Sequence, residues 1–238
     1  MSARRMLVVG AHSADFVWRA AGAIAKHTVA GGEAVVLALS YGERGESGEL
    51  WKDPNQTVEN VKRLRHAEAE RAAAAVGARL ETFDLGDYPL RIRDEDIDRL
   101  AALMREYAPH VVLTHPDRDP FNPDHPVAHT AVATARQLTA GAGVSSGFRT
   151  APPSEFLVFE PHQPELCGFV PTVFVDITDV MAAKQEAMAS MGAQGYLRDY
   201  YTQRADQRGN HARRVTGDPG IRQAEAFQRL IPNVVGAL

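Results

Sequence analysis

Short apolar runs alternate along the chain with longer segments in which apolar residues recur every three to four positions. Continuous runs at 6–10 (MLVVG) and 33–40 (EAVVLALS) are typical of strands buried on both faces of a parallel sheet. Residues 14–30 between them have a helical pattern that ends at a Gly-Gly pair, and Ser13 is placed to cap this helix. Together these segments predict a βαβ unit with a right-handed crossover.

The same alternation continues to the end of the chain. We predict further strands over 80–85, 110–114, 156–160 and 172–177, and helices over 55–77, 94–107, 125–138, 180–191 and 221–230. Segment 195–220 is polar and Arg-rich, and we expect it to form a loop over the site. Strands that alternate with helices predict the α/β class, as a Rossmann-like three-layer fold with a mostly parallel central sheet. No repeat or linker divides the sequence, so we expect one catalytic domain over 1–238.

Composition narrows the classes of function. The 238 residues have a net charge of −4, which argues against a nucleic-acid or membrane-surface binder, because such proteins usually carry a basic face. A single cysteine rules out an intrachain disulfide and a Cys-rich zinc site. No apolar stretch approaches the ~20 residues that span a bilayer, and the N-terminus does not resemble a secretory signal, so we expect a cytoplasmic protein. Apolar helix faces fit a core or a homo-oligomer contact equally well, which leaves the oligomeric state open.

Polar residues gather where the predicted strands end. They are His12 and Asp15 after the first strand, Glu43, Arg44 and Glu46 after the second, His115, Asp117, Asp119, Asn122 and His125 after the fourth, and Glu160 and His162 after a later one. In open α/β sheets, ligands bind beyond the carboxyl ends of the strands. We therefore expect these side chains to share one cleft rich in imidazole and carboxylate.

Imidazole and carboxylate are ligands that suit zinc. His12 and Asp15 lie three residues apart at a strand-to-helix turn, and His125 begins a distant helix, so the three can point at one ion. Catalytic zinc sites commonly have three protein ligands and one open position. The same spacing also fits a carboxylate that complements a helix dipole and a histidine that caps a helix, so spacing alone leaves both interpretations open.

Three motifs resemble those of a known family. His12-Ser-Ala-Asp15 resembles the A-H-P-D-D-E signature of the PIG-L/LmbE-like zinc-dependent deacetylases. Segment 114–125 (THPDRDPFNPDH) resembles that family's T-H-P…H-P-D-H motif, and 224–227 (AEAF) resembles its C-terminal segment. The resemblance covers nearly the whole chain and implies bound zinc, with His12, Asp15 and His125 as its ligands.

Two departures from the deacetylase pattern change the expected reaction. Ala14 stands where these deacetylases have the carboxylate that acts as general base, and Asn122 stands where they have a histidine. A hydrolase without its base loses roughly 10²–10⁴-fold in rate. The first motif, loop 41–48 (YGERGESG) and segment 160–165 (EPHQPE) are more similar to the family's 4-oxalomesaconate hydratases. We therefore expect a zinc-dependent hydratase, with an N-deacetylase and a non-catalytic small-anion binding protein as alternatives.

A hydratase of this branch needs groups that move protons and groups that bind carboxylates. We expect Glu46 and His162 to transfer protons. The alternative without a catalytic role is a solvated loop carboxylate for Glu46 and a turn residue for His162. The expected substrate is a small polycarboxylate, which arginine can bind with two parallel hydrogen bonds. The candidates for substrate binding are Arg44, Arg118, Arg213 and Arg214, some of which we expect to be ordinary surface residues, together with Asn122.

Overall fold

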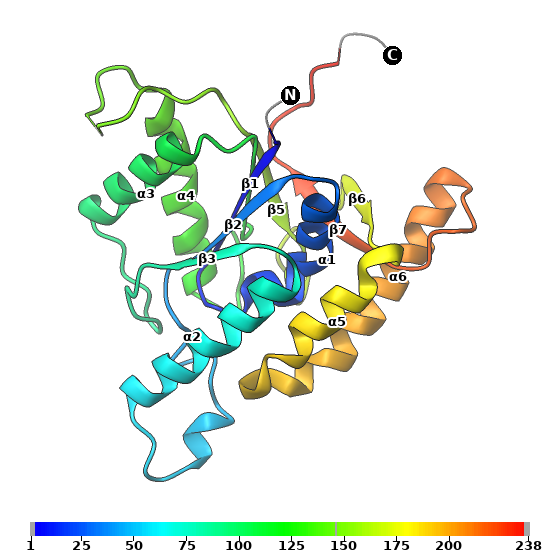
Figure 1. Ribbon diagram of the computed structural model, residues 1–238, viewed down its shortest axis with the longest axis horizontal. Helices are drawn as coiled ribbons and strands as arrows, with labels where there is room; N and C mark the ends of the chain where they lie inside the picture. The colour runs from blue at the N-terminus through cyan, green and yellow to red at the C-terminus, as the bar shows by residue number, and fades with distance from the viewer. Residues whose placement is uncertain (1–2, 146, 236–238) are drawn as a thin grey trace.

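Seven strands form one sheet in the order β3-β2-β1-β4-β5-β7-β6 (Figure 1). The computed structural model describes residues 3–145 and 147–235. The strands are β1 (Arg5–Gly10), β2 (Glu33–Ala38), β3 (Arg79–Thr82), β4 (Val111–Thr114), β5 (Glu155–Phe159), β6 (Val173–Asp176) and β7 (Ala224–Arg229). β3, β2, β1, β4 and β5 run parallel to one another, and β7 is antiparallel to both β5 and β6. The predicted α/β class and mostly parallel sheet are thus confirmed.

Helices cover both faces of this sheet. They are α1 (Asp15–Val29), α2 (Val58–Ala75), α3 (Asp94–Tyr107), α4 (Asp124–Ala140), α5 (Met181–Ala189) and α6 (Arg198–Thr216), with 3₁₀ turns at Leu50–Lys52, Thr178–Val180 and Gly192–Leu197. In Figure 1, α3 and α4 lie on one side of the strands, and α5 and α6 lie on the other. Among the described residues, no helix is both long and apolar enough to cross a membrane.

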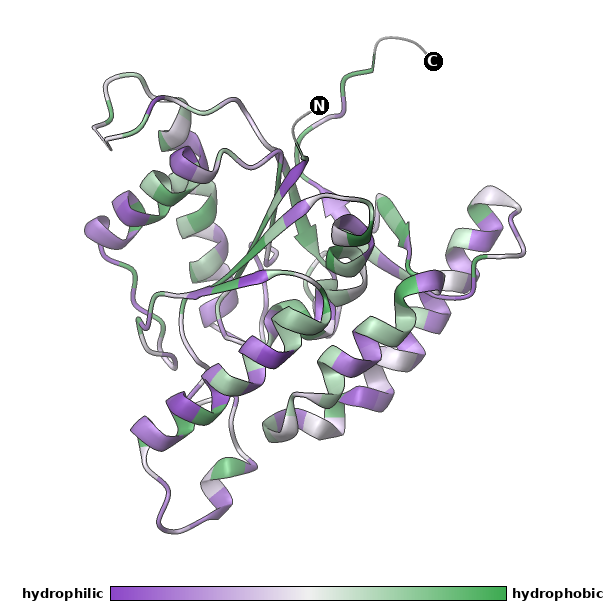
Figure 2. Ribbon diagram, in the orientation of Figure 1, coloured by the Kyte–Doolittle hydropathy of each residue, from purple (hydrophilic) through white to green (hydrophobic). Residues whose placement is uncertain are grey.

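The pleat of β1 shows why both faces are covered. Met6 and Val8 point into a core shared with α1, α2, α5 and α6, whereas Leu7 and Val9 point into a second core shared with α3 and α4. A strand that is apolar on both faces must lie in the middle of the sheet, because side chains alternate between the faces. In Figure 2 the central strands are largely green, and the helices carry purple residues on their outer sides.

Two predictions for the C-terminal part of the chain are wrong. Segment 195–220 is mostly the helix α6 rather than a loop, because Tyr201, Ala205 and Ala212 recur at helical spacing and bury one face of a polar sequence. Gly209 also lies on this face, where a Cβ atom would come within 2.0 Å of the Arg222 carbonyl oxygen.

Segment 221–230, predicted as a helix, contains the strand β7. Its six residues pair with β5 on one side and β6 on the other, and a run this short has no period that separates a strand from a buried helix. Ser13 does not cap α1 either, because its hydroxyl donates to the Tyr41 carbonyl oxygen at 2.8 Å and Ala14 occupies the capping position. The other predicted elements are present with ends that differ by a few residues.

Candidate metal centre and active site

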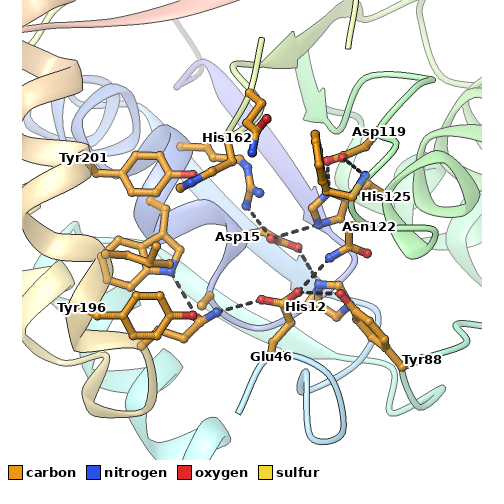
Figure 3. Close-up of a pocket in the computed structure, with 17 residues that line it drawn as sticks. His12, Asp15, Glu46, Tyr88, Asp119, Asn122, His125, His162, Tyr196 and Tyr201 are labelled. Carbon is orange, nitrogen blue, oxygen red and sulfur yellow. Dashed lines mark hydrogen bonds and ion pairs between the residues drawn. The ribbon is translucent and has the colours of Figure 1, made fainter. Parts of the chain in front are cut away.

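A cavity of about 250 Å³ opens at the carboxyl ends of the parallel strands (Figure 3). Its lining combines charged, amide and aromatic side chains from the segments that follow each of the strands β1 to β5, from the region before α6 and from the start of α6. The lining residues are His12, Ala14, Asp15, Trp18, Arg19, Glu46, Tyr88, Asp119, Phe121, Asn122, His125, His162, Gln163, Gln194, Tyr196, Leu197 and Tyr201. Of the side chains expected to share one cleft, seven line this cavity, namely the three proposed ligands with Glu46, Asp119, Asn122 and His162. Five do not line it: Glu43, Arg44, His115, Asp117 and Glu160.

The three proposed metal ligands meet at one point of this cavity. His12 follows β1, Asp15 begins α1, and His125 lies in the first turn of α4. One potential ligand atom from each of them lies within 4.8 Å of the others, and all three residues are buried. His12 Nδ1 is 3.6 Å from one Asp15 oxygen, and His125 Nε2 is 3.7 Å from the other. This convergence fits the metal-site interpretation, which the spacing alone left open beside helix-dipole and helix-capping roles.

Each histidine is held by a carboxylate behind it. His12 Nε2 lies 3.1 Å from Asp124, and His125 Nδ1 lies 2.8 Å from Asp119. The opposite ring nitrogens, His12 Nδ1 and His125 Nε2, are buried and have no hydrogen-bond partner among the described residues. A carboxylate that accepts the N–H of one ring nitrogen leaves the lone pair of the other directed at a metal. Two orphaned lone pairs beside a buried carboxylate therefore fit a divalent cation.

The protonation states of His12, Asp15 and His125 also suit a cation. Burial opposes ionisation of Asp15, but the charges of His115 and Arg19 and hydrogen bonds from the histidines hold its pKa well below its usual range. Burial also opposes a charge on His12, yet Asp124 and Asp15 raise its pKa to about 10. Burial lowers the pKa of His125 to about 3. These charges fit a cation at this point, and a metal ion bound there would take the place of the proton on His12.

Glu46 faces the triad from the loop after β2. One of its oxygens accepts hydrogen bonds from Asn122 Nδ2 at 2.8 Å and from the Tyr88 hydroxyl at 3.2 Å, and the other accepts from Gln194 Nε2 at 2.8 Å. Gly42, with a φ of +72°, allows this approach, because a Cβ atom there would lie 2.9 Å from the Glu46 Cβ. Three donors from three different segments fix the Glu46 carboxylate as an acceptor.

His162 faces the triad from the segment after β5 and is held by α6. In the view of Figure 3 it lies on the other side of Asp15 from Glu46. Its ring stacks on Tyr200 with 4.1 Å between centroids, and the Tyr200 hydroxyl donates to the His162 carbonyl oxygen. Arg204 donates to Tyr200 and to Glu160, which ties α6 to the segment that precedes His162. Burial, followed by the charges of Arg19 and Arg204, lowers the pKa of His162.

The predicted arginines lie outside the cavity lining. Arg44 is exposed and donates to the Asp87 carbonyl oxygen, and Arg118 is exposed. Arg213 donates to the Ile221 carbonyl oxygen from the last turn of α6, beside the exposed Arg214. Arg213 and Arg214 were expected in a loop over the site, but that segment is the helix α6, and neither side chain lines the cavity.

The sequence interpretation missed Arg19, the one arginine or lysine among the cavity-lining residues of the described chain. Its guanidinium donates to Asp15 at 2.6 Å, and its Nε is buried without a hydrogen-bond partner. A signal was present, because Arg19 follows Asp15 by four residues and so lies on the same face of the predicted helix. Asn122 does line the cavity, but its amide donates to Glu46 and accepts from the Asp124 N–H.

Comparison with known proteins sets this site in a family. A family model described as GlcNAc-PI de-N-acetylase, PIG-L, matches residues 7–136. The chain belongs to the PIG-L family. Within it, the chain is 44% identical to 4-oxalmesaconate hydratase of Pseudomonas putida KT2440 over 231 residues, which cover 96% of this chain and 90% of that protein.

A second relative catalyses a different reaction. The chain is 32% identical over 164 residues, 60% of its length and 56% of the relative's, to 1D-myo-inositol 2-acetamido-2-deoxy-alpha-D-glucopyranoside deacetylase of Rhodococcus jostii RHA1. Among solved structures, the crystal structure of GalB, the 4-carboxy-2-hydroxymuconate hydratase of Pseudomonas putida KT2440, superposes with a TM-score of 0.96. It shares 43% identity, and the match covers 99% of both chains. PIG-L relatives of this chain thus include both hydratases and deacetylases.

Proposed function

We propose that the protein is a metal-dependent hydratase that adds water to a carbon–carbon double bond of 4-oxalomesaconate or of its enol tautomer, 4-carboxy-2-hydroxymuconate. The product is 4-carboxy-4-hydroxy-2-oxoadipate. One observation carries the proposal: Glu46 and His162 face the His12–Asp15–His125 triad in one cavity, while Ala14 leaves no carboxylate where a deacetylase needs its base. The near-full-length similarity to two hydratases supports it. All seven strands belong to one sheet, which supports a single catalytic domain.

Zinc is the metal that these ligands suit best. Two imidazole nitrogens and one carboxylate oxygen match three-ligand catalytic zinc sites, and His12, Asp15 and His125 would hold the ion. When bound, zinc supplies a positive charge that activates a water or polarises a substrate oxygen. Asp119 and Asp124 keep the two histidines in the tautomers that present a lone pair to the ion.

Glu46 and His162 would both begin the reaction as bases. Glu46 accepts three hydrogen bonds, an arrangement that suits an ionised carboxylate. The lowered pKa of His162 leaves its ring neutral near neutral pH. Because both groups begin as bases, a mechanism that uses these two residues draws the proton delivered to carbon from the substrate or from water.

The enol tautomer allows a sequence in which the protons balance. His162 takes the proton of the C2 hydroxyl and delivers it to C5, which leaves a C2 ketone conjugated to a C3–C4 double bond. Glu46 takes a proton from water as the hydroxyl oxygen bonds to C4, and electrons move onto the C2 oxygen as an enolate. Glu46 then returns its proton to C3, and both side chains end as they began.

Arg19 would recognise one of the three substrate carboxylates. It carries the one guanidinium in the described cavity lining, and its bond to Asp15 sets its position beside the triad. A planar guanidinium can orient a carboxylate with two hydrogen bonds, which fixes the substrate relative to both bases. The amides of Gln163 and Gln194 add neutral donors to the same lining.

Amide hydrolysis is the second candidate, because the family model and one relative are named for de-N-acetylation. It requires Glu46 to replace the base that is absent at Ala14. A third candidate, a binding protein without catalytic activity, would also explain why Ala14 replaces the carboxylate base. Release of acetate from N-acetylglucosamine derivatives would identify the deacetylase, and tight binding without turnover would identify the binding protein.

The direct test follows loss of the substrate's conjugated absorbance, with and without a chelator, alongside metal analysis. We expect about one zinc per chain, and turnover that chelation removes and zinc restores. Asp15→Ala and His125→Ala should lose metal and turnover together. A protein that turns over the substrate at full rate after complete metal removal would falsify the proposed mechanism.

A further inference from the structure

A second buried carboxylate close to the site has no role in the mechanism above. Glu43 has 0% relative exposure, and neither of its side-chain oxygens accepts a hydrogen bond from any described donor. A buried carboxylate anion without donors costs several kcal/mol or more, and such a group normally takes up a proton instead. Protonation would also give Glu43 a hydrogen that it can donate.

Glu43 Oε1 lies 3.7 Å from where a Cβ atom on Gly86 would stand, which places it beside the next residue, Asp87, and Asp87 is also completely buried. Asp87 lies in the turn before α3, and its two oxygens accept the backbone N–H groups of Arg44 and Gly45 at 2.7–3.1 Å. These bonds hold the loop after β2 directly before Glu46, which lines the cavity. Glu43 and Asp87 therefore join the loop that carries Glu46 to the turn that carries Tyr88.

The charges around Glu43 are mixed. Burial raises the pKa of Glu43, the residue's own backbone N–H dipole lowers it, and the Asp87 carboxylate raises it by its charge and as an acceptor for the protonated acid. Lys62 of α2 lowers it, but Lys62 is paired with Asp84 at 2.7 Å. The remaining polar neighbours are Arg44, whose guanidinium binds the Asp87 carbonyl oxygen, and Tyr41, whose pKa Glu43 helps to raise.

We propose that Glu43 is a neutral carboxylic acid in the folded protein, that it donates a hydrogen bond to Asp87, and that this pair positions Glu46 in the cavity. Glu43 is a positioning residue, since it contacts the loop and not the reacting atoms. Its effect on turnover rests on the proposed role of Glu46, but its protonation does not. When Glu43 ionises, two buried carboxylates repel each other and the loop that holds Glu46 loosens.

Infrared spectroscopy tests the protonation without any assay of activity. At about pH 6, above the ordinary glutamate pKa of 4.5, wild-type protein should show the carbonyl stretch of a protonated carboxylic acid. Labelling glutamate with ¹³C at Cδ should move this band in the wild-type protein, so the result does not depend on a variant that folds. Glu43→Gln should remove the band. The matched control Glu49→Gln, which deletes an exposed carboxylate paired with Lys52, should keep it. Absence of a glutamate acid band from the wild-type protein overturns the proposal.

The dependence of stability on pH gives a second measurement. Because the pKa of Glu43 is raised by folding, its contribution to stability is fully present below the ordinary value of 4.5 and is lost as the pH rises through the folded-state pKa. The melting temperature of Glu43→Gln should therefore rise relative to that of wild type as the pH increases, whereas Glu49→Gln should show no such trend. The alkaline decline of wild-type kcat should also move to higher pH in Glu43→Gln. Parallel stability curves for wild type and Glu43→Gln would refute the role of this proton.

Discussion

Replacing Asp124 by Asn tests whether the carboxylate behind His12 sets the metal site. Asp124 is 1% exposed, and it interacts with His12 Nε2 at 3.1 Å and accepts the N–H groups of Tyr88 and Leu90, both at 2.9 Å. Asparagine offers one acceptor oxygen in place of two. Either orientation of its amide therefore turns an NH₂ group toward an N–H that previously had an acceptor.

The size of the effect follows from these contacts. A buried N–H that loses its acceptor costs about 1–3 kcal/mol, and we expect Asp124→Asn to destabilise the protein by that amount. The loss of the negative charge that orients His12 should lower zinc affinity roughly 10–100-fold. At about 1.4 kcal/mol for each factor of ten, this is about 1.4–2.8 kcal/mol of binding free energy.

The assay is a competition titration in which a chromophoric chelator takes zinc from the folded protein. Asp98→Asn is the control, because it removes the same charge from an exposed position on α3. We expect the control to bind zinc as wild type does, and Asp124→Asn to release zinc at a much lower chelator concentration. Wild-type zinc affinity in folded Asp124→Asn would show that Asp124 does not orient the ligand, and the argument from the orphaned nitrogens would lose its basis.

Three further predictions concern substrate and protons. His162→Ala should keep its zinc and lower kcat by about 10²–10⁴-fold. His162 must be neutral to act as a base and its pKa is lowered, so wild-type activity should fall only as the pH drops below the ordinary histidine pKa of 6.5. An acid limb of the pH–activity profile at or above pH 6.5 would contradict the role of His162. Arg19→Gln should raise KM for the tricarboxylate more than tenfold, by about 1.5–3 kcal/mol for a charge-assisted bond, and Arg19→Lys should recover part of it; an unchanged KM in both would remove Arg19 from substrate binding. Tyr200→Phe keeps the stacked ring but loses the bond to the His162 carbonyl oxygen, so kcat should fall several-fold and the acid limb should shift, whereas KM stays near wild type.

The fold was easiest to predict from the sequence where a strand is marked by its own continuous apolar run. Runs such as 6–10 and 33–40 have no polar interruption, and a buried parallel strand needs nothing else to be recognised. The three proposed metal ligands could be picked out for a related reason, because His12 and Asp15 directly follow such a run and His125 begins the helix after the next central strand, β4. Their convergence in the structure follows from the parallel order of β1 and β4.

The parts that could not be predicted depend on contacts between distant segments. β7 is a strand because β5 and β6 offer their edges to it, and neither edge is visible within its six residues. The structural role of Asp124 was hidden too, since its partners come from two other segments, 12 and 88–90. The four predicted arginines failed as lining residues because the choice rested on loop position, whereas the cavity takes its guanidinium from the helix face of Asp15.

The late position of β7 has a consequence for how the protein is made. β6 pairs with β7 and with no other strand of the described sheet, so it has no place to dock until the ribosome has added residues 224–229. α6, which supports His162, packs against the same strand. A chain that stops short of residue 224 would leave the edges of β5 and β6 open to other molecules, and such unpaired edges promote aggregation. The sheet can therefore be complete only after residues 224–229 have emerged.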